Sequence, residues 1–360
     1  MPSGLLAHNH LPAENGSQLD GSEQITASPR PACPFCGRLG DILHTEMVDW
    51  LNGVPESWGM RKCLSCAVAW LDPQPVADDI PQLYARYYTH HANQPATYLG
   101  RLQPQVSKAV LARLGYPVMA PKRILPRLLS YFPFAKRVAL LNVVGLSASE
   151  GGSLLDVGCG NGELIARLHS LGWKVSGVDF DASAVSYARS QHLDVRLGTI
   201  ADIQETERYD VIVLSHVIEH VADPVQLLRD CGKCLRPGTG RIIIFTPNIN
   251  SAGHARFEKY WRGLEVPRHF ILFSPAGLRM CIERAGLLVR STSTETRQAQ
   301  MIYKQSSCAK AGERRVAERL DFKISVKIAA RVFRWVEDLR VRLKDDVGEE
   351  IFCVCGKPSP

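Results

Sequence analysis

The pattern of apolar and polar positions is most regular between residues 153 and 181. A short apolar run from Leu154 to Val157 is typical of a buried parallel strand. Apolar residues then recur at helical spacing between Leu164 and Leu171, and a second apolar run ends at Asp179. The pattern therefore predicts a strand, a turn, an amphipathic helix and a second strand, which is the repeating unit of nucleotide-binding α/β folds.

The turn between the first strand and the helix carries Gly158, Gly160 and Gly162, which let the backbone bend tightly and approach a ligand. Asp179 follows 21 positions after Gly158, where a carboxylate can accept both hydroxyl protons of an adenosine ribose. Glu163 replaces the last glycine of the dinucleotide fingerprint, and no phosphate-binding GK[ST] lysine motif is present. We therefore expect an adenosine ligand without a phosphate, S-adenosylmethionine (SAM), rather than NAD.

Five segments extend this pattern in one order: LLDVGCGNGE, GVDFD, RYDVIVLSHVIEHVADP, LRPGTGRIIIFTPN and PRHFILFSPAGL. They resemble the successive motifs of class I SAM-dependent methyltransferases from about Gly151 to Arg290, with a final strand in GEEIFCVCGKP. The resemblance implies a Rossmann-like α/β fold, with a seven-stranded, mostly parallel sheet and helices on both faces. The alternative is a similar unit that binds another cofactor or none.

The same resemblance implies which residues hold SAM. The glycine turn and its preceding aspartate would hold the methionyl end, Asp179 the ribose, and Phe180 the adenine. The segment GTIADI would line the edge of the adenine. It carries Thr199 where the family more commonly has the Asp of a Gly-Asp pair, so the residue that contacts the adenine stays open. The residues expected to contact SAM are Asp156, Gly158, Gly160, Gly162, Asp179, Phe180, Ile200, Asp202 and Ser215.

The segment after the fourth expected strand carries the candidates for substrate chemistry. If the segment is helical, His216, Glu219 and His220 share one face. It also fits the HxxEH pattern of a zinc protease helix, which we reject because the segment follows a strand of the sheet. It is more similar to the ExxEH segment that holds Mg²⁺ in ubiquinone-biosynthesis O-methyltransferases and small-RNA 2′-O-methyltransferases. Because imidazole replaces the first carboxylate, we expect no catalytic divalent metal at these three residues, with a softer metal as the alternative.

Two histidines are candidates for the catalytic base. His220 is the first, because imidazole accepts a proton from a hydroxyl near neutral pH, and its alternative role is to buttress the cofactor loop. His269 is the second, because the loop after the fifth strand forms the acceptor wall in the resembling family. Arg268 beside it is a candidate to bind an anionic acceptor group.

The chain has 11 cysteines and no recognisable export signal, so thiols or metal ligands are expected rather than disulfides. Two CxxC pairs near the N-terminus can converge on one tetrahedral, structural Zn²⁺, and buried free thiols are the alternative. The resemblance extends to a zinc-ribbon-like module that precedes the catalytic domain in many bacterial methyltransferases. For Cys231 and Cys234, in an expected helix, packing is the favoured explanation. The four expected zinc ligands are Cys33, Cys36, Cys63 and Cys66.

With 360 residues, 45% of them hydrophobic, the chain can bury one large core and smaller additions. No apolar run reaches eighteen residues, so we expect a cytoplasmic protein. The predicted segments are a disordered leader (1–30), a zinc-ribbon-like module (31–71), a helical cap or linker (72–150), the methyltransferase core (151–296), a basic amphipathic helical insertion (297–345) and the final core strand with its tail (346–360).

The insertion carries a cationic amphipathic helix. From Lys304 to Lys344 there are 12 Lys or Arg and 5 Asp or Glu, a surplus of 12 − 5 = +7 that equals the net charge of the whole chain. One expectation is that its apolar stripe packs on the domain or on a second subunit. The other is that it lies peripherally on the inner membrane face, beside the basic apolar stretch near Pro126. The stripe is Ile324, Ile328, Val332, Trp335, Val336 and Leu339, opposite Lys323, Lys327, Arg331, Arg334 and Arg342.

Three functions remain compatible with these features. The first is methyl transfer to a small-molecule, sugar or glycan, or lipid-linked acceptor, most simply at a hydroxyl. The second is RNA methylation with the zinc module and basic helix holding the RNA, which we disfavour because the helix lacks interleaved aromatic residues for stacking bases. The third is a scaffold without activity, which the intact glycine turn and acidic contacts disfavour. Acceptor, methylated atom and oligomeric state stay open.

Overall fold

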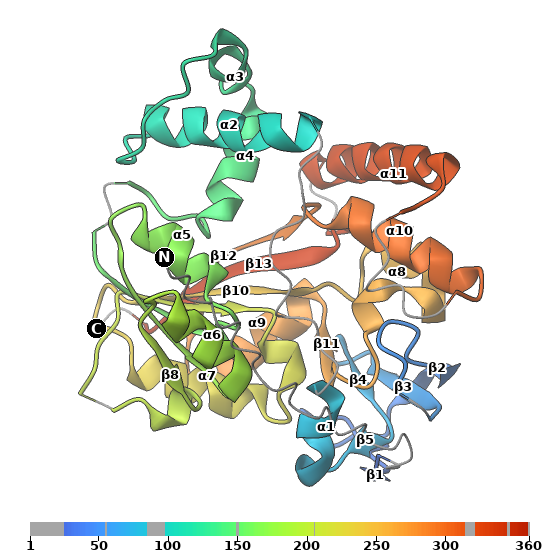
Figure 1. Ribbon diagram of the computed structural model, residues 1–360. Helices are drawn as coiled ribbons and strands as arrows, with labels where there is room; N and C mark the ends of the chain where they lie inside the picture. Colours follow the sequence, from blue (N-terminus) through green and yellow to red (C-terminus); the bar gives the residue numbers. More distant parts are fainter. Residues whose placement is uncertain are drawn as a thin grey trace, which may run out of the picture.

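The computed structural model describes residues 25–54, 56–84, 98–148, 151–204, 206–313, 321–343 and 346–358. A seven-stranded sheet crosses its centre in the order β12-β13-β10-β9-β6-β7-β8 (Figure 1). The five strands from β10 to β8 pair in parallel, whereas β13 runs antiparallel to both of its neighbours. The predicted fold class is therefore confirmed. The strands are β6 (Ser153–Val157), β7 (Lys174–Asp179), β8 (Val195–Leu197), β9 (Val211–Ser215), β10 (Arg241–Pro247), β12 (Leu288–Glu295) and β13 (Glu350–Gly356).

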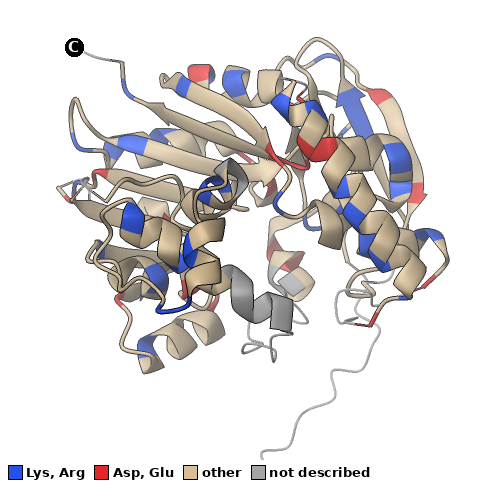
Figure 2. Ribbon diagram, turned by 90° about the horizontal axis from the view of Figure 1, so that it is seen from above, with Lys and Arg blue, Asp and Glu red and all other residues tan. Residues whose placement is uncertain are grey.

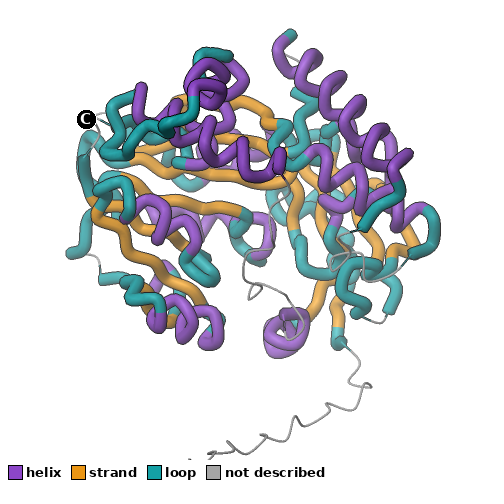
Figure 3. Tube along the Cα trace, turned by 45° about the horizontal axis from the view of Figure 1, so that its top comes forward, coloured by secondary structure: helices purple, strands orange, loops and turns teal. Residues whose placement is uncertain are grey.

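Both faces of the central strands are apolar, as expected for a parallel sheet that is covered on two sides. Successive side chains enter different cores: Leu154 and Val213 belong to one cluster, and Leu155 and Leu214 belong to the other. Figure 3 shows helices on both sides of the sheet. The first core includes residues of α4 (Pro133–Asn142), α5 (Glu163–His169) and α6 (Ala182–Ser190), and the second those of α7 (Pro224–Lys233) and α9 (Pro275–Arg284).

The N-terminal module shares a sheet with the core. Strands β2 (Asp41–Met47), β3 (Trp58–Cys63) and β4 (Val68–Leu71) form an antiparallel sheet with β11 (Ile271–Phe273), which belongs to the core segment. Trp70 and Phe273, which lie in paired strands, are fully buried. The module is therefore continuous with the predicted core rather than an independent unit.

The module also begins earlier than the sequence predicted. Strand β1 (Ala27–Ser28) pairs with β5 (Gln74–Pro75), and Ile25 is buried. The indole nitrogen of Trp70 donates to the carbonyl of Arg30 at 2.7 Å. Residues 25–30 of the predicted leader are thus ordered on the module, because they supply an apolar side chain and backbone bonds to it. The rest of the predicted leader lies outside the described residues.

The remaining helices lie before the core and between its strands. The predicted insertion contains two of them, α10 (Ala299–Lys310) and α11 (Ile324–Arg342), before the last strand. No helix of the described ranges has the length and hydropathy needed to cross a bilayer. The other helical elements are η1 (Ala77–Asp79), α1 (Ile80–Tyr84), α2 (Tyr98–Arg113), α3 (Ile124–Leu129), η2 (Ile200–Asp202), η3 (Ile218–His220), α8 (Ala252–Phe257), η4 (Glu258–Tyr260) and η5 (Arg262–Leu264).

The structure contradicts one branch of the expectation for α11, which was packing on the domain or on a second subunit. Its apolar stripe does not pack on the domain, because Ile324 is 75% exposed and Trp335 is 68% exposed. The helix instead turns Ala330 and Glu337 inward, where both are buried. The sequence pattern identified the stripe correctly but could not tell which face the domain would bind.

Candidate functional site

The glycine turn after β6 forms the floor of the site. Gly158 (φ +69°) and Gly160 (φ +51°) both adopt the left-handed conformation. A Cβ on Gly158 would come within 2.6 Å of Val217, whereas a Cβ on Gly160 would meet no atom within 4 Å. The amide of Gly160 donates to Asp179 at 2.7 Å, which ties the turn to the end of β7. The turn is thus tightly packed behind Gly158 and open to a ligand at Gly160.

A cavity of about 340 Å³ lies above this turn at the carboxyl ends of β6, β7 and β9. Open α/β sheets bind their ligands at this edge. The Phe180 ring stands on its wall and is 55% exposed, and His220 also lines it. The structure therefore brings together these residues expected from the sequence: Gly158, Gly160, Asp179, Phe180, Ile200 and Ser215.

A second cavity of about 310 Å³ shares Gly158 and Ser215 with the first. Asp156 lines it together with Asn161 and Arg297. Burial, together with the nearby Asp179 charge, raises the pKa of Asp156 to about 8. Arg297 was missed by the sequence analysis, because it follows the predicted end of the core and no motif marks it. Its guanidinium lies over the Phe245 ring at 5.3 Å and 3.6 Å from Glu350.

Two residues expected to contact SAM line neither cavity. Gly162 begins α5 with φ +79°, and a Cβ there would come within 2.5 Å of Leu193. Asp202 accepts hydrogen bonds from the amide and hydroxyl of Thr199 at 2.7 and 3.0 Å. Both residues therefore shape loops beside the site. Thr199, which is hydrogen-bonded to Asp202, lines the first cavity, whereas Asp202 does not.

The segment after β9 does not form a helix that would carry His216, Glu219 and His220 on one face. His216 has φ +57°, a left-handed conformation that interrupts regular structure directly after β9. The only helical turn in this segment is the short 3₁₀ turn Ile218–His220. His216 lies 3.2 Å from Glu219 and 2.8 Å from Glu350, in β13. Burial alone would lower the pKa of His216, but hydrogen bonds to these carboxylates outweigh it and raise the pKa to about 10. His216 is thus an imidazolium that joins the ends of β9 and β13.

His220 and His269, the two candidate bases, are in contact, with ring centroids 4.6 Å apart. The Nδ1 atom of His220 lies 3.1 Å from the carbonyl of Arg268, and that of His269 lies 2.7 Å from the carbonyl of Gly263. Because a carbonyl only accepts, both Nδ1 atoms carry the proton and both Nε2 atoms carry the lone pair. Burial lowers the pKa of His220, and burial together with His220 lowers that of His269 to about 4. Both rings are therefore neutral at pH 7.

Only one of these rings reaches the cavity. His220 lines it, whereas His269 is buried behind His220 and lines neither cavity. The Nε2 atom of His269 is 3.7 Å from a carboxylate oxygen of Glu265. The geometry therefore favours His220 over His269 as the group that meets an acceptor.

Arg268 does not face an acceptor. Its side chain is fully buried and forms a two-point ion pair with Asp49, at 3.0 Å for each contact. Asp49 lies in the N-terminal module and also accepts from the amides of Leu51 and Asn52. The anion-binding hypothesis is therefore wrong, because a carboxylate of the chain already occupies this guanidinium.

A group of possible metal ligands lies beside the first cavity. Glu219, His220 and His269 each offer a ligand atom within 4.8 Å of the others. The carboxylate of Glu219 already accepts a hydrogen bond from the Thr246 hydroxyl at 2.9 Å. Burial alone would raise the pKa of Glu219, but the hydrogen bond and the positive charge of His216 outweigh it and lower the pKa to about 2. The set contains His269 in place of the His216 considered from the sequence.

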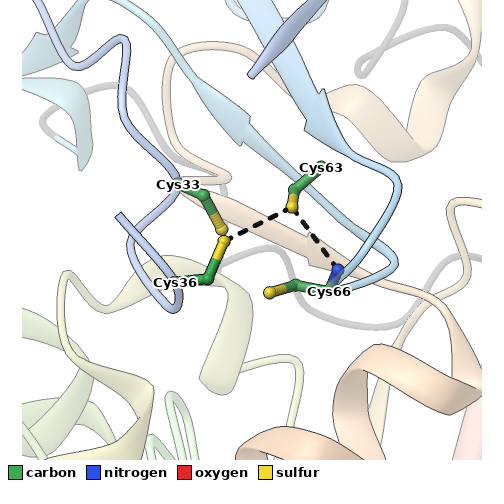
Figure 4. A group of neighbouring side chains, drawn as sticks. All are labelled: Cys33, Cys36, Cys63 and Cys66. Atoms are coloured by element: carbon green, nitrogen blue, oxygen red, sulfur yellow. Dashed lines mark hydrogen bonds between the residues drawn. The ribbon is translucent and has the colours of Figure 1, made fainter. Parts of the chain in front are cut away.

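The four N-terminal cysteines converge as predicted. Cys33 and Cys36 lie in one turn and Cys63 and Cys66 in another, and the two turns face each other (Figure 4). All four sulfur atoms lie within 4.8 Å of one another, and those of Cys36 and Cys63 are 3.7 Å apart. A tetrahedral zinc with Zn–S bonds of about 2.3 Å separates its sulfur ligands by about 3.8 Å. The cluster is therefore compatible with a zinc ion. Cys231 and Cys234 are buried in the packing of α7, separate from this cluster.

Comparison with known proteins finds similarities in the central part of the chain. Residues 128–292 match the family model described as a methyltransferase domain. The chain is 39% identical over 142 residues to a ubiquinone biosynthesis O-methyltransferase of Nitrobacter winogradskyi, covering 38% of this chain and 52% of that protein. It is 33% identical over 131 residues to the enzyme of the same name from Proteus mirabilis, covering 34% of this chain and 50% of that protein. The chain thus spans about half the length of these relatives.

The chain is also similar, at low sequence identity, to solved structures of methyltransferases. The CcbJ methyltransferase from Streptomyces caelestis matches with a TM-score of 0.39 and 15% identity, over 62% of this chain and 89% of that one. A SAM-dependent methyltransferase from Archaeoglobus fulgidus matches with a TM-score of 0.39 and 17% identity, over 72% of this chain and 100% of that one. The central part of the chain is thus similar to a methyltransferase domain, and its sheet has the order β12-β13-β10-β9-β6-β7-β8.

Proposed function

We propose that the protein transfers the methyl group of SAM to a hydroxyl of a small-molecule, sugar or lipid-linked acceptor. The observation that carries this proposal is the first cavity. It is lined by the open glycine turn at Gly160, by Asp179, the carboxylate expected to bind a ribose, and by the neutral imidazole of His220. The name of these relatives, ubiquinone biosynthesis O-methyltransferase, supports a hydroxyl acceptor.

The residues fit SAM. Gly160 leaves room where a side chain would otherwise stand, Asp179 lies beside it, and Phe180 offers an exposed flat ring. Asp156 is a buried carboxyl whose ionisation is suppressed, so a cationic ligand group in the second cavity would stabilise its charge. When bound, SAM supplies an activated methyl group on a sulfonium, and the protein's task is to align the acceptor and exclude water.

His220 is the proposed base. Its Nδ1–H is directed to the carbonyl of Arg268, so in the neutral ring Nε2 is the basic nitrogen that would accept a hydroxyl proton. His269 is proposed as a positioning residue, because its ring lies against His220 and lines neither cavity. The buried Arg268–Asp49 pair fixes the carbonyl that orients His220.

The alternative to a base at His220 is a metal ion bound by Glu219, His220 and His269, in which the imidazole nitrogen would be a ligand and not a proton acceptor. We favour the metal-free base because the carboxylate of Glu219 is already engaged by His216 and Thr246. Turnover that is lost in EDTA and restored by Mg²⁺ or Mn²⁺ would assign these atoms to a metal instead.

The function is tested by incubating the purified protein with methyl-labelled SAM and an extract of its native host. Label is then followed into lipid, glycan, RNA and small-metabolite fractions. Incorporation into a small-molecule, glycan or lipid fraction, released by conditions that cleave methyl ethers, supports the proposal. Incorporation into RNA alone would replace the acceptor class, and failure to bind SAM in calorimetry would reject the activity.

Replacing His220 with alanine is expected to lower kcat by about 100- to 10,000-fold, the usual contribution of a general base. The affinity for SAM should remain within a few-fold, because the substitution leaves the glycine turn and Asp179 unchanged. His169→Ala, at an exposed histidine on α5, is the matched control and should retain full turnover. Wild-type turnover in His220→Ala would remove this residue from the mechanism.

The affinity for SAM is expected to rise with pH. Below the pKa of about 8, the Asp156 carboxyl of the free protein is protonated and must lose its proton before it pairs with a cation. Affinity should therefore increase by up to about tenfold per pH unit between pH 6 and 8 and then level off. Calorimetry in buffers of different ionisation enthalpy measures the released proton. Asp156→Asn should bind more weakly with a flat profile, and an unchanged slope in this variant would contradict the assignment.

A further inference from the structure

The exposed side of α11 combines apolar and basic side chains. Six apolar residues on one stripe are between 43% and 75% exposed. Four basic residues along the same segment are exposed as well: Lys323, Arg331, Arg340 and Arg342. Of the two carboxylates of α11, Glu337 is buried, whereas Asp338 lines a cavity with Trp335 and Leu339, contacts Thr296 and lies 3.7 Å from Arg334. The stripe consists of Ile324, Ile328, Val332, Trp335, Val336 and Leu339.

The packing of α11 fixes this outward orientation. Ala330 is fully buried, and Ala329 and Phe333 pack against the main core. The Phe333 ring lies 5.1 Å from that of Tyr303 in α10. Rotating the helix to bury its stripe would expose these contacts, so the stripe belongs to the outer surface of the folded domain.

A second apolar and basic surface surrounds α3. Residues 98–148, which contain α2, α3 and α4, have eight Lys or Arg and no Asp or Glu. Around α3, five large apolar side chains are between 54% and 72% exposed: Ile124, Leu125, Leu128, Tyr131 and Phe132. In Figure 1, α3 and α11 lie at the same end of the molecule, and Figure 2 looks down on that end and shows Lys and Arg along its helices.

We propose that this end of the molecule, formed by the stripe of α11 and the exposed residues around α3, docks on an anionic lipid bilayer. Apolar side chains would enter the boundary between head groups and acyl chains, while the neighbouring basic side chains contact lipid phosphates. Neither helix can cross the bilayer, so the attachment is peripheral. The surface does not depend on the proposed methyl transfer, and it would bring the domain to a lipid-borne acceptor.

Charge and shape favour a bilayer over the other partners of an apolar surface. A second copy would present the same surplus of positive charge to this surface, which opposes self-association. A cavity of about 480 Å³ does lie beside α3, but Tyr131 is the only aromatic residue of the described ranges that lines it, so it lacks the row of stacking platforms that holds single-stranded RNA. A bilayer with anionic head groups offers both negative charge and an apolar interior, so it matches the basic and the apolar side chains of this surface.

The proposal is tested by flotation of the full chain with vesicles of phosphatidylcholine alone or with 30% phosphatidylglycerol. The protein should float with the anionic vesicles, and the floated fraction should fall with salt. Val332→Asp/Leu339→Asp should reduce the bound fraction at least tenfold, and each of Lys327→Glu and Arg331→Glu should weaken affinity at least fivefold, as expected for about 1 kcal/mol per basic residue. Leu39→Asp, at a residue that is 75% exposed on the N-terminal module, is the matched control and should bind normally.

Trp335 provides a second, spectroscopic readout. It is 68% exposed, whereas the other five tryptophans are at most 7% exposed. Vesicles with brominated acyl chains should therefore quench the emission of this residue, and Trp335→Phe should abolish the quenching without releasing the protein. Absence of flotation with the wild-type chain, equal binding to neutral vesicles, or a concentration-dependent dimer that the Val332→Asp/Leu339→Asp variant disrupts would overturn the proposal.

Discussion

Replacing Cys63 with serine is expected to abolish tight zinc binding and to destabilise the whole chain, not only its N-terminal part. Structural zinc contributes about 10–16 kcal/mol of apparent binding free energy in small zinc modules, which is comparable with the total stability of a domain. The knuckle at Cys63 and Cys66 joins β3 to β4, and β4 pairs with β11 of the core. Loss of the metal should therefore loosen the edge of the core that leads to His269.

Zinc content by mass spectrometry and thermal unfolding of the purified variant measure this effect. Cys231→Ala removes a buried thiol from the other CxxC pair and is the matched control. It should keep one zinc per chain and lose only about 1–2 kcal/mol, the cost of a small cavity. A wild-type chain that contains no metal and unfolds at the same temperature after exhaustive chelation would show that the four cysteines are structural thiols.

The sequence predicted the parts of the fold that depend on local pattern. Apolar runs and the glycine turn identified β6, α5 and β7, because buried parallel strands and close backbone turns restrict residue type strongly. The spacing of the cysteines likewise predicted a cluster that the structure forms. Gly160 and Asp179 meet as expected, since both lie at the same edge of neighbouring parallel strands.

The parts that were wrong depend on contacts between distant segments. Arg268 was assigned to an acceptor because no local pattern indicates that Asp49, 219 positions away, fills its guanidinium. The helical face expected for His216 failed because its left-handed backbone and the distant Glu350 direct its ring elsewhere. The stripe of α11 was found, but its orientation depends on which face packs better, and Ala330 and Phe333 fit the core without it.

The ion pair between Asp49 and Arg268 gives a second large expected effect. Asp49→Asn removes the two-point partner of a fully buried guanidinium and leaves only Glu265, 3.4 Å from its Nε, as a counter-charge, which should cost up to about 3–5 kcal/mol of unfolding free energy in urea titrations. Glu207→Gln, in the half-exposed pair with Arg196, is the matched control and should cost less than about 1 kcal/mol. A small effect at Asp49 would mean that water or other groups can solvate Arg268 in the folded state.

Replacing both partners separates the pair's stability from its effect on the site. Arg268→Met in the Asp49→Asn background removes the buried cation, and Glu265 keeps Arg262 as its ionic partner, so much of the lost stability should return. Turnover should nevertheless stay below that of the wild type, because the pair holds the backbone carbonyl that orients His220. A lower kcat with unchanged SAM affinity in this stable double variant would link the N-terminal module to the chemistry of the cavity. Full recovery of both stability and kcat would instead make the pair purely structural.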